Sequence, residues 1–545
     1  MSLERLWHKS YAPGVPTEFE PEKITMAERL SQVAAKYPDR VAFVYMGKKI
    51  TYREYEGLVN RFARALADLG VKEGDKVAML LPNIPQMVIA NHAVYRLGAV
   101  TAMNNPLYTE RELAHQLDDS DATMLVTLDL LLPRALKLKA ETKIRTIITC
   151  HISDYLPFPK KQLFPYVKKA MFRKVEPQPG VYQFMDLIGK YPDMPVENKA
   201  RWDELAALIY TGGTTGVSKG AMLTHANISS VVQQFSAWFP DLKDTYENLL
   251  GIYPIFHSAG YSVGQNLPIW NGWCCTLVPK PEPGAIVEML SKFKPTFLPG
   301  VPTIYTGLLR NEKFRKMNLS FVKGYFGGAA PLPEDTLSQL RQLHGAIIYD
   351  VYGATENTAF ATVTPWGGKV KFGTVGVPLP GTDIKIVDLD TGTRELPPKE
   401  AGEICIKGPQ VMSGYYKKPE ETAQALKDGW FYTGDMGYVD DKGYLTLVGR
   451  YKEMYINGGY NVYPLEIENI LAQHPAVAIA AVIGAPDDIK GEVGWAFLMK
   501  KPGSEVGEEE LKSFCKARMA DYKVPSRFII DNALPMTGLG KIDEI

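Results

Sequence analysis

The sequence predicts an α/β fold in which a large N-terminal domain of layered, mainly parallel α/β lobes is followed by a small α+β domain. Three observations predict it. Short apolar runs alternate with amphipathic helical patterns through much of the first 350 or so residues, as they do around parallel sheets. After about residue 375, apolar and polar residues alternate as in half-buried antiparallel strands. From Asn461 onward, the order helix, strand, strand, helix, strand is enough for a separate unit.

The 545 residues are too many for one hydrophobic core, so we expect the chain to divide. The boundary is placed at Gly449–Lys452. This gives an N-terminal domain of residues 1–450, with a β section at about 375–448, and a C-terminal domain of residues 451–545.

The first elements are well signalled. The segment 51-TYRE-54 has the spacing of a capping box, and it predicts a helix that ends before Gly70. Apolar residues recur every three or four positions along this helix: Tyr55, Leu58, Phe62, Leu66 and Leu69. A strand over 77–81, a helix over about 86–97 and a strand near Val100 follow.

Later elements read as strands and then as a mixed unit. Residues 383–387 and 403–407 alternate like half-buried strands, and 438–447 predicts a hairpin that turns at 440–443. In the last domain we expect helices over 465–473 and 508–519 and strands over 476–483, 495–500 and 527–530.

Composition excludes several classes of protein. Lys+Arg and Asp+Glu are both 61, so no overall basic charge indicates a nucleic-acid partner. The N-terminal residues carry Glu4 and Arg5 and no apolar core, so no secretory signal is predicted, and no apolar run is long enough for a membrane span. The five cysteines show no CxxC spacing, which favours a reduced, cytoplasmic setting.

A glycine- and threonine-rich turn, 210-YTGGTTGVSKGAMLTH-225, follows the apolar run 205–209. Its spacing fits neither a Walker A loop nor the dinucleotide fingerprint. Even so, its glycines allow backbone N–H groups to approach anionic oxygens, its threonines add hydroxyl donors and its lysine adds charge. The residues concerned are Thr211, Gly212, Gly213, Thr214, Thr215, Gly216 and Lys219. Polyphosphate binding and a flexible surface turn are both compatible with this pattern.

The turn resembles the signature loop of the adenylate-forming, or AMP-binding, superfamily. Further segments resemble that superfamily in the same order: 254-PIFH-257, 327-GGAAPL-332, 352-YGATE-356, 432-YTGD-435, 449-GRYKEMYINGGYNVYPLEIE-468 and 535-PMTGLGKID-543. The resemblance spans nearly the whole chain. Within the superfamily, the segments 154–174 and 407-KGPQVMSGYY-416 resemble medium- and long-chain fatty acyl-CoA synthetases.

This resemblance implies an activity. ATP would activate a fatty acid, long-chain or medium-chain, to an acyl-adenylate, and coenzyme A would then form the thioester with release of AMP and pyrophosphate. The alternative within enzymes is an aryl- or alicyclic-acid–CoA ligase or a luciferase-like adenylate oxygenase. From another class, a nucleotide-binding regulatory protein without turnover is the alternative.

The resemblance also implies site residues. Those for ATP and AMP are the turn residues named above together with Gly328, Ala329, Asp350, Tyr352, Gly353, Thr355, Asp435 and Arg450. Tyr352 would stack on adenine, Asp350 would lie near its amine, and Asp435 would bind the ribose hydroxyls. Glu356 and Thr214 would hold Mg²⁺, and Lys541 would reach the α-phosphate and the acid.

Three further groups of residues are implied in the same way. Lys452 corresponds to the hinge of a mobile C-terminal domain, and Gly458 and Gly459 would line the tunnel for the pantetheine arm of coenzyme A. His257 would gate the junction of that tunnel with the acyl pocket. The acyl-pocket candidates are His257, Ala259, Tyr261, Val301 and Tyr325, joined by Ile255 and Val263.

The segment 154-DYLPFPKKQLFPYVKKAMFRK-174 has a physical pattern of its own. Leu163, Phe164, Val167 and Met171 are predicted to share one helical face, with six Lys and Arg around it. A basic amphipathic helix can lie on an anionic membrane, and this is our hypothesis for peripheral association. A solvated surface helix is the alternative.

Overall fold

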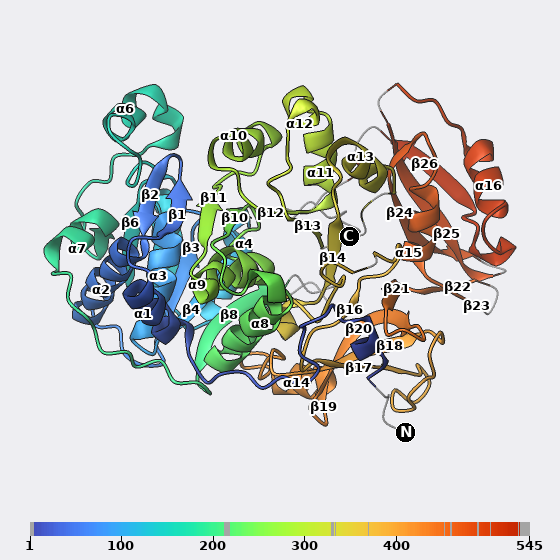
Figure 1. Cartoon of the computed structure of the whole chain (residues 1–545), viewed down its shortest axis with the longest axis horizontal. Helices are drawn as coiled ribbons and strands as arrows, with labels where there is room; N and C mark the ends of the chain where they lie inside the picture. Colours follow the sequence, from blue (N-terminus) through green and yellow to red (C-terminus); the bar gives the residue numbers. More distant parts are fainter. Residues whose placement is uncertain are drawn as a thin grey trace.

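The computed structural model describes residues 5–211, 218–328, 332, 334–368, 370–451, 453–457, 460–487, 490–501, 503–531 and 534. Within these residues, four sheets form an elongated molecule, with the N-terminal sheets at one end and the C-terminal sheet at the other (Figure 1). The expected α/β fold, with a large body of mainly parallel sheets and a small C-terminal unit, is confirmed.

A seven-stranded sheet has the order β7-β6-β5-β3-β4-β8-β9, and every neighbouring pair is parallel except β8 with β9. Its strands in chain order are β3 (Lys76–Leu80), β4 (Val100–Met103), β5 (Met124–Leu128), β6 (Thr146–Cys150), β7 (Val181–Gln183), β8 (Leu205–Thr211) and β9 (Lys219–Thr224). The accompanying helices are α2 (Tyr52–Asp68), α3 (Pro85–Arg96), α4 (Glu110–Asp119), α5 (Leu132–Glu141) and α7 (Phe184–Lys190).

A nine-stranded sheet has the order β16-β15-β14-β13-β12-β10-β11-β1-β2. Its strands are β1 (Val41–Tyr45), β2 (Lys48–Thr51), β10 (Asn248–Gly251), β11 (Cys274–Leu277), β12 (Phe297–Gly300), β13 (Gly324–Gly327), β14 (Ile348–Tyr352), β15 (Thr362–Val363) and β16 (Val377–Pro378). Its helices are α1 (Met26–Lys36), α8 (His225–Ala237), a π-helix (Gly260–Asn266), α9 (Leu267–Asn271), α10 (Pro283–Phe293), α11 (Pro302–Leu309), α12 (Glu312–Lys316) and α13 (Glu334–His344).

The helices form layers around these two sheets because side chains alternate along each strand. Val77 and Met79 of β3 belong to the central core, which α2, α3 and α8 share with both sheets. Ala78 and Leu80 face the opposite way, into a core covered by α4 and α5. The outer face of the nine-stranded sheet is covered by α10, α11 and α13.

The two remaining sheets are mainly antiparallel. One contains β17 (Asp383–Val387), β18 (Gly402–Lys407), β19 (Leu426–Lys427), β20 (Trp430–Val439) and β21 (Leu445–Arg450), with α14 (Pro419–Ala425) beside it. The other contains β22 (Tyr455–Asn457), β23 (Tyr460–Val462), β24 (Val477–Asp487), β25 (Gly491–Lys500) and β26 (Arg527–Asp531), with α15 (Pro464–Leu471) and α16 (Glu508–Lys516). The last sheet has a buried cluster of its own.

Most of the predicted elements are present. The capping box at Thr51 and Glu54 starts α2, and the hairpin turn closes with a bond from Gly443 N to Asp440 O. The continuous helical face predicted within 154–174 is wrong. Helix α6 covers only Lys160–Val167, contains Pro165 and is followed by a separate 3₁₀ turn, while Phe164 points inward and is buried.

Candidate nucleotide site

The glycine-rich turn connects two antiparallel strands. Thr211 ends β8, Lys219 begins β9, and these two residues are register partners. The turn between them, with the predicted residues Gly212, Gly213, Thr214, Thr215 and Gly216, lies outside the described residues. Ser218 is described, and it accepts hydrogen bonds from His115 Nε2 at its carbonyl and from Gln116 Nε2 at its hydroxyl, both at 3.1 Å.

Lys219 and Glu356 both contact the same side chain, that of Tyr415. The Lys219 ammonium lies 4.5 Å from the centroid of the Tyr415 ring, and the Tyr415 hydroxyl donates to Glu356 Oε1 at 2.7 Å. Burial raises the pKa of Glu356, although the Tyr415 hydroxyl and the nearby Lys219 charge both favour its ionised form. A half-buried carboxylate near the Lys219 cation is of the kind that suits a hard metal ion, which prefers oxygen ligands.

The backbone of Glu356 is fixed by two tight turns. Gly353 permits a close approach, since a Cβ there would lie 2.2 Å from the Ala359 carbonyl oxygen. Thr358 and Ala359 both have positive φ angles, of 56° and 90°, which non-glycine residues rarely adopt. Such strained backbone is concentrated at functional sites.

The segment 412–418, which we call the strap, runs alongside β9. Met412 N donates to Glu356 O at 2.7 Å, and Ser413 N donates to Met222 O. Met222 N in turn donates to Gly414 O, and Tyr416 N donates to Gly220 O. The strap therefore joins the strand that begins with Lys219 to the turn that carries Glu356.

The opposite side of the site is built from paired strands. Tyr352, at the end of β14, donates its hydroxyl hydrogen to Asp435 Oδ2 at 2.8 Å. Arg450 Nε donates to Asp435 Oδ1 at 3.0 Å, and Asp435 and Arg450 are register partners on β20 and β21. Besides burial, the charge of Lys219 lowers the pKa of Glu356 and that of Asp435 raises it, so Glu356 lies within electrostatic range of both sides.

Asp350 lies within β14, and Gly328 directly follows the neighbouring parallel strand, β13. Asp350 is the register partner of Gly327, the last residue of β13. Burial raises the pKa of Asp350 to about 7. A Cβ on Gly328 would lie 2.8 Å from Val351 Cγ2, so the close passage of β13 beside β14 requires glycine there. Ligands of open α/β sheets bind at such carboxyl ends of strands.

Thr355 lies beside the π-helix. Its hydroxyl is 3.5 Å from that of Ser258, and Ser262 Oγ donates to the Thr358 carbonyl at 3.0 Å. His257, in the turn before the π-helix, accepts a hydrogen bond at Nδ1 from Ala259 N at 3.3 Å. π-Helical turns are rare and often occur at functional sites.

The acyl-pocket candidates have different environments. Tyr261 is fully buried, with its hydroxyl hydrogen-bonded to Tyr95 and 3.1 Å from the Thr101 hydroxyl. Tyr325 is buried on β13 and its hydroxyl makes no hydrogen bond with any described residue. Val301 precedes α11, and both Val301 and Ala259 are half-buried.

A small apolar cavity of about 10 Å³ lies near these candidates. Its lining includes Val263 of the π-helix, Phe235 of α8, Phe297 of β12 and Phe326 of β13. The cavity has room for about one water molecule. An alkyl chain would enter only if these side chains moved apart.

The predicted residues Ala329, Lys452, Gly458, Gly459 and Lys541 lie outside the described residues. The prediction also missed Tyr415, which contacts both Lys219 and Glu356. Its signal was present in 407-KGPQVMSGYY-416, where a glycine precedes two tyrosines, but nothing in that local pattern names a partner 59 residues away. In the part of the chain that the structure describes, no three His, Cys, Asp or Glu side chains form a metal-binding group.

Comparison with known proteins shows which family this chain resembles. Residues 30–416 match the AMP-binding enzyme family, and residues 466–541 match the AMP-binding enzyme C-terminal domain. A long-chain-fatty-acid–CoA ligase of Bacillus subtilis is 38% identical over 99% of this chain and 97% of its own length. A protein of the same name from Escherichia coli O6:H1 is 35% identical over the same shares of the two chains.

Solved structures agree with this. ATP-bound MatB from Rhodopseudomonas palustris has a TM-score of 0.84 and 29% identity, covering 95% of this chain and 97% of that one. MenE from Bacillus subtilis, in complex with ATP and magnesium ion, has a TM-score of 0.77 and 28% identity, with 94% and 98% covered. Matches of this extent in both sequence and structure establish that the chain belongs to the family of AMP-binding enzymes.

Proposed function

We propose that this enzyme uses ATP to convert the carboxylate of a long-chain fatty acid into an acyl-adenylate and then transfers the acyl group to coenzyme A. The observation that carries the proposal is the set of contacts that holds Lys219 and Glu356 against Tyr415 and holds Asp435 between Tyr352 and Arg450. Full-length relatives named long-chain-fatty-acid–CoA ligases support the acid class.

The chemistry explains why such a site suffices. A carboxylate repels nucleophiles, so it must first gain a better leaving group, and AMP from ATP can serve. Bringing the acid in line with the α-phosphorus and offsetting the negative charge there supply most of the rate. No serine or cysteine nucleophile is required.

Each part of the site has a role in this proposal. Thr211 and Lys219, with the turn between them, bind the β- and γ-phosphates, and Thr355 contacts the α-phosphate. Tyr352 stacks on adenine, Asp350 and Gly328 border the base, and Asp435 with Arg450 binds the ribose. Glu356 suits the Mg²⁺ that enters with ATP, because Mg²⁺ is usually held by one or two carboxylates plus phosphates. Mg²⁺ offsets phosphate charge.

We propose a second role for the C-terminal domain, residues 451–545. It would turn about Lys452, present Lys541 for adenylation, and then place Gly458 and Gly459 along the pantetheine path. Lys541→Ala is expected to lower acid-dependent pyrophosphate exchange about 10²–10³-fold, the scale of losing one charge-stabilising donor. Gly459→Leu should leave that exchange intact and block thioester release. Equal loss of both steps in Gly459→Leu would remove the tunnel assignment.

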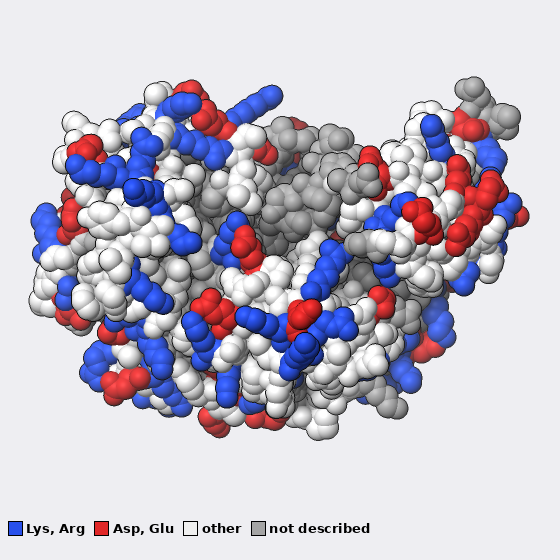
Figure 2. Space-filling model, turned by 90° about the horizontal axis from the view of Figure 1, so that it is seen from above, with Lys and Arg blue, Asp and Glu red and all other residues white. Residues whose placement is uncertain are grey.

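The membrane hypothesis rests on residues 158–174. Large apolar side chains there are strongly exposed: Phe158 at 83%, Leu163 at 52%, Tyr166 at 74%, Val167 at 71% and Met171 at 41%. The same stretch carries Lys160, Lys161, Lys168, Lys169, Arg173 and Lys174. Figure 1 shows α6 projecting at the end of the molecule opposite the C-terminal sheet, and Figure 2 shows Lys and Arg side chains, with some Asp and Glu among them, over that end.

We infer that this basic, apolar surface docks on anionic lipid, where a long-chain acid partitions. Each cation contributes about 1 kcal/mol near such a surface. No helix within the described residues has the length and apolar composition to cross a bilayer. Lys168→Glu with Lys169→Glu should abolish cosedimentation with anionic vesicles, while Lys512→Glu with Lys516→Glu on α16 should not. Vesicle binding that is unaffected by salt and by both pairs of substitutions would refute docking.

The function itself is tested with purified enzyme and a panel of acids graded by chain length, with one aromatic acid included. We expect acid-dependent exchange of labelled pyrophosphate into ATP, followed by AMP and thioester when coenzyme A is added. A preference for the aromatic acid would replace the fatty-acid proposal. An anthranilate CoA ligase, AuaEII, shares the fold at a TM-score of 0.85, so the panel addresses a concrete alternative. No exchange with any acid would end the proposal.

A further inference from the structure

Helix α4 touches the glycine-rich turn from outside the nucleotide site. His115 and Gln116 of this helix donate hydrogen bonds to Ser218. Near the end of the helix, the Tyr210 hydroxyl donates to Asp119 Oδ2 at 2.8 Å and to Gln116 O at 3.1 Å. Tyr210 and Ser218 flank the turn on β8 and before β9. One end of α4 therefore holds both flanks of the predicted phosphate loop.

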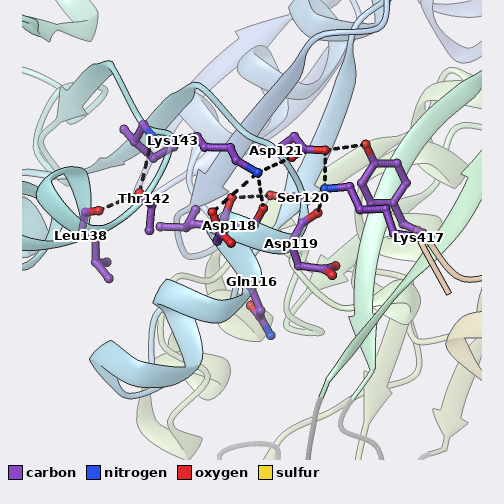
Figure 3. A network of polar contacts seen from close by, with 12 residues as sticks. Gln116, Asp118, Asp119, Ser120, Asp121, Leu138, Thr142, Lys143 and Lys417 are labelled. Carbon is purple, nitrogen blue, oxygen red and sulfur yellow. Dashed lines mark hydrogen bonds and ion pairs between the residues drawn. The ribbon is translucent and has the colours of Figure 1, made fainter.

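Directly after α4, Asp121 gathers three donors. Its carboxylate lies 2.6 Å from Lys143 Nζ and 2.5 Å from Lys417 Nζ, and it accepts the Tyr416 hydroxyl at 2.9 Å. In Figure 3, Lys143 and Lys417 reach Asp121 from opposite sides. Lys417 Nζ also donates to the carbonyl of Asp119 at 3.2 Å, where the helix dipole favours a cation.

Both ends of the Asp121–Lys417 ion pair are held in unusual backbone. Asp121 has a φ of 56° and Lys417 a φ of 55°, in the left-handed region. An aspartate adopts this region more readily than most residues, whereas a lysine does so at a cost. Strain of this kind persists only where surrounding contacts impose it. The ion pair supplies such a contact for the strap.

The strap connects the contacts of Asp121 with the proposed nucleotide site. Tyr416 and Lys417 are its anchored residues, and Tyr415, next to them, holds Glu356 and lies under Lys219. Tyr415 and Tyr416 point to opposite sides of the strap, one to the site and one to Asp121. Anchoring Tyr416 thus fixes the rotation of the strap that places the Tyr415 ring.

We propose that Asp121 is a positioning residue of the nucleotide site, which sets Tyr415 against Glu356 and Lys219 by anchoring Tyr416 and Lys417. The inference rests on the proposed use of ATP. Asp121 touches no substrate. Burial raises its pKa, but the hydrogen bonds from Lys143, Lys417 and Tyr416 outweigh burial and hold the pKa below its usual value, so the carboxylate is charged at neutral pH.

The backbone geometry selects the variants. Asp121→Asn keeps the shape, tolerates the left-handed backbone and leaves an acceptor for Tyr416, but it removes the charge. Asp121→Gly deletes the side chain without adding backbone strain. Asp118→Asn is the matched control, because Asp118 is 3.7 Å from Lys143 and makes no ion pair with a described residue of the strap. Alanine is avoided at Asp121 because a Cβ residue without a polar group disfavours this φ.

The expected result is a split between kinetic constants. In acid-dependent pyrophosphate exchange, the KM for MgATP should rise about 5-fold in Asp121→Asn and about 10-fold in Asp121→Gly, with kcat and the KM for the acid nearly unchanged. Asp118→Asn should match the wild type. A lower Tm without a change in the KM for MgATP would show that Asp121 is only structural and would overturn the proposal.

A double-mutant cycle tests the route through Tyr415. If Asp121 acts through Tyr415, Asp121→Gly should add almost nothing to the KM increase of Tyr415→Ala, because that change already removes both the hydroxyl contact with Glu356 and the ring contact with Lys219. Fully additive changes would overturn the proposal. Calorimetric titration with MgATP, in the absence of acid, repeats the cycle as a dissociation constant. That binding arm still decides the role of Asp121 if the wild type shows no exchange, a result that would count only against the proposed reaction.

Discussion

The two sides of the proposed nucleotide site are held in place by different means. Tyr352, Asp435 and Arg450 sit on β14, β20 and β21, and the Asp435–Arg450 pair is a register partnership within one sheet. Glu356 and Tyr415 sit on a 3₁₀ turn and on the strap, where Ala221 and Tyr415 form only an isolated bridge. The side proposed to bind the ribose, with Tyr352, Asp435 and Arg450, is held by backbone ladders, and we call it the sheet-held side. The side proposed to bind the phosphates, with Glu356 and Tyr415, is held by side-chain contacts between distant segments, and we call it the loop-held side.

The difference fits the order of events in adenylation. Pyrophosphate leaves while the nucleoside stays bound to the acyl group, so the nucleoside side can be permanent. Loops and straps open locally at lower free-energy cost than central strands do. The phosphate side can therefore change its conformation as pyrophosphate leaves. Its original conformation must then be restored by a few contacts, above all those of Tyr415.

The largest effect should come from the phosphate side. Glu356→Gln keeps an oxygen acceptor for the Tyr415 hydroxyl but removes the charge that we propose binds Mg²⁺. We expect exchange to fall about 10²–10³-fold, the scale of removing one group that stabilises transition-state charge. Initial rates at saturating MgATP measure it. An activity within about threefold of the wild type, with Tm unchanged, would mean that the Glu356 charge does not contribute to catalysis. The proposed difference between the two sides would then be wrong.

Much of the sheet-held side could be predicted from local sequence. Strands 383–387 and 403–407 alternate cleanly because one face is buried, and the hairpin at 440–443 has its own turn residues. The capping box at Thr51 is equally local, since both of its bonds lie within three residues. Elements of this kind carry their signal within a few positions.

The loop-held side could not be predicted in the same way. Tyr416 bonds to a residue 295 positions earlier, and Asp121 sits in a turn with no motif of its own. Even the basic segment 154–174, whose composition was clear, was predicted to be more regular than it is, because Pro165 and the inward turn of Phe164 divide it. Long-range side-chain contacts leave no periodic trace in the sequence.

A smaller effect is expected on the ribose side. Asp435→Asn retains one oxygen and loses the charge-assisted bond with Arg450 or the bond from Tyr352. Hydrogen bonds to charged groups are worth about 1.5–3 kcal/mol, so the KM for MgATP should rise about 10–100-fold with little change in kcat. Because β20 and β21 keep their backbone ladder, circular dichroism should be unchanged. A fall in kcat equal to the rise in KM would show that this side also responds to the transition state.

The last prediction concerns stability rather than catalysis, and it is a pH dependence at Asp350 on β14. Burial raises the pKa of Asp350 to about 7, whereas in the unfolded chain that carboxyl titrates near 3.8. The folded state therefore binds the proton more tightly, and its free energy of unfolding falls as pH rises from about 4 to about 7, by at most about 1.4 kcal/mol per pH unit. Asp350→Asn cannot lose this proton, so its Tm relative to the wild type should improve between pH 5 and pH 8.

Asp440 provides the control for that shift, because it lies in the turn after β20 and is paired with Lys371. Burial raises the pKa of Asp440, but the hydrogen bond from Lys371 and two backbone N–H groups outweigh burial and lower the pKa below 3.8. Its stabilisation is complete above that value and is lost only as pH falls through the lowered pKa. The Tm difference between Asp440→Asn and the wild type should thus be the same at pH 5 and pH 8. Equal pH responses in the two variants would indicate that Asp350 is hydrated and ionised in the folded enzyme, and that the base end of the site is as open as its phosphate side.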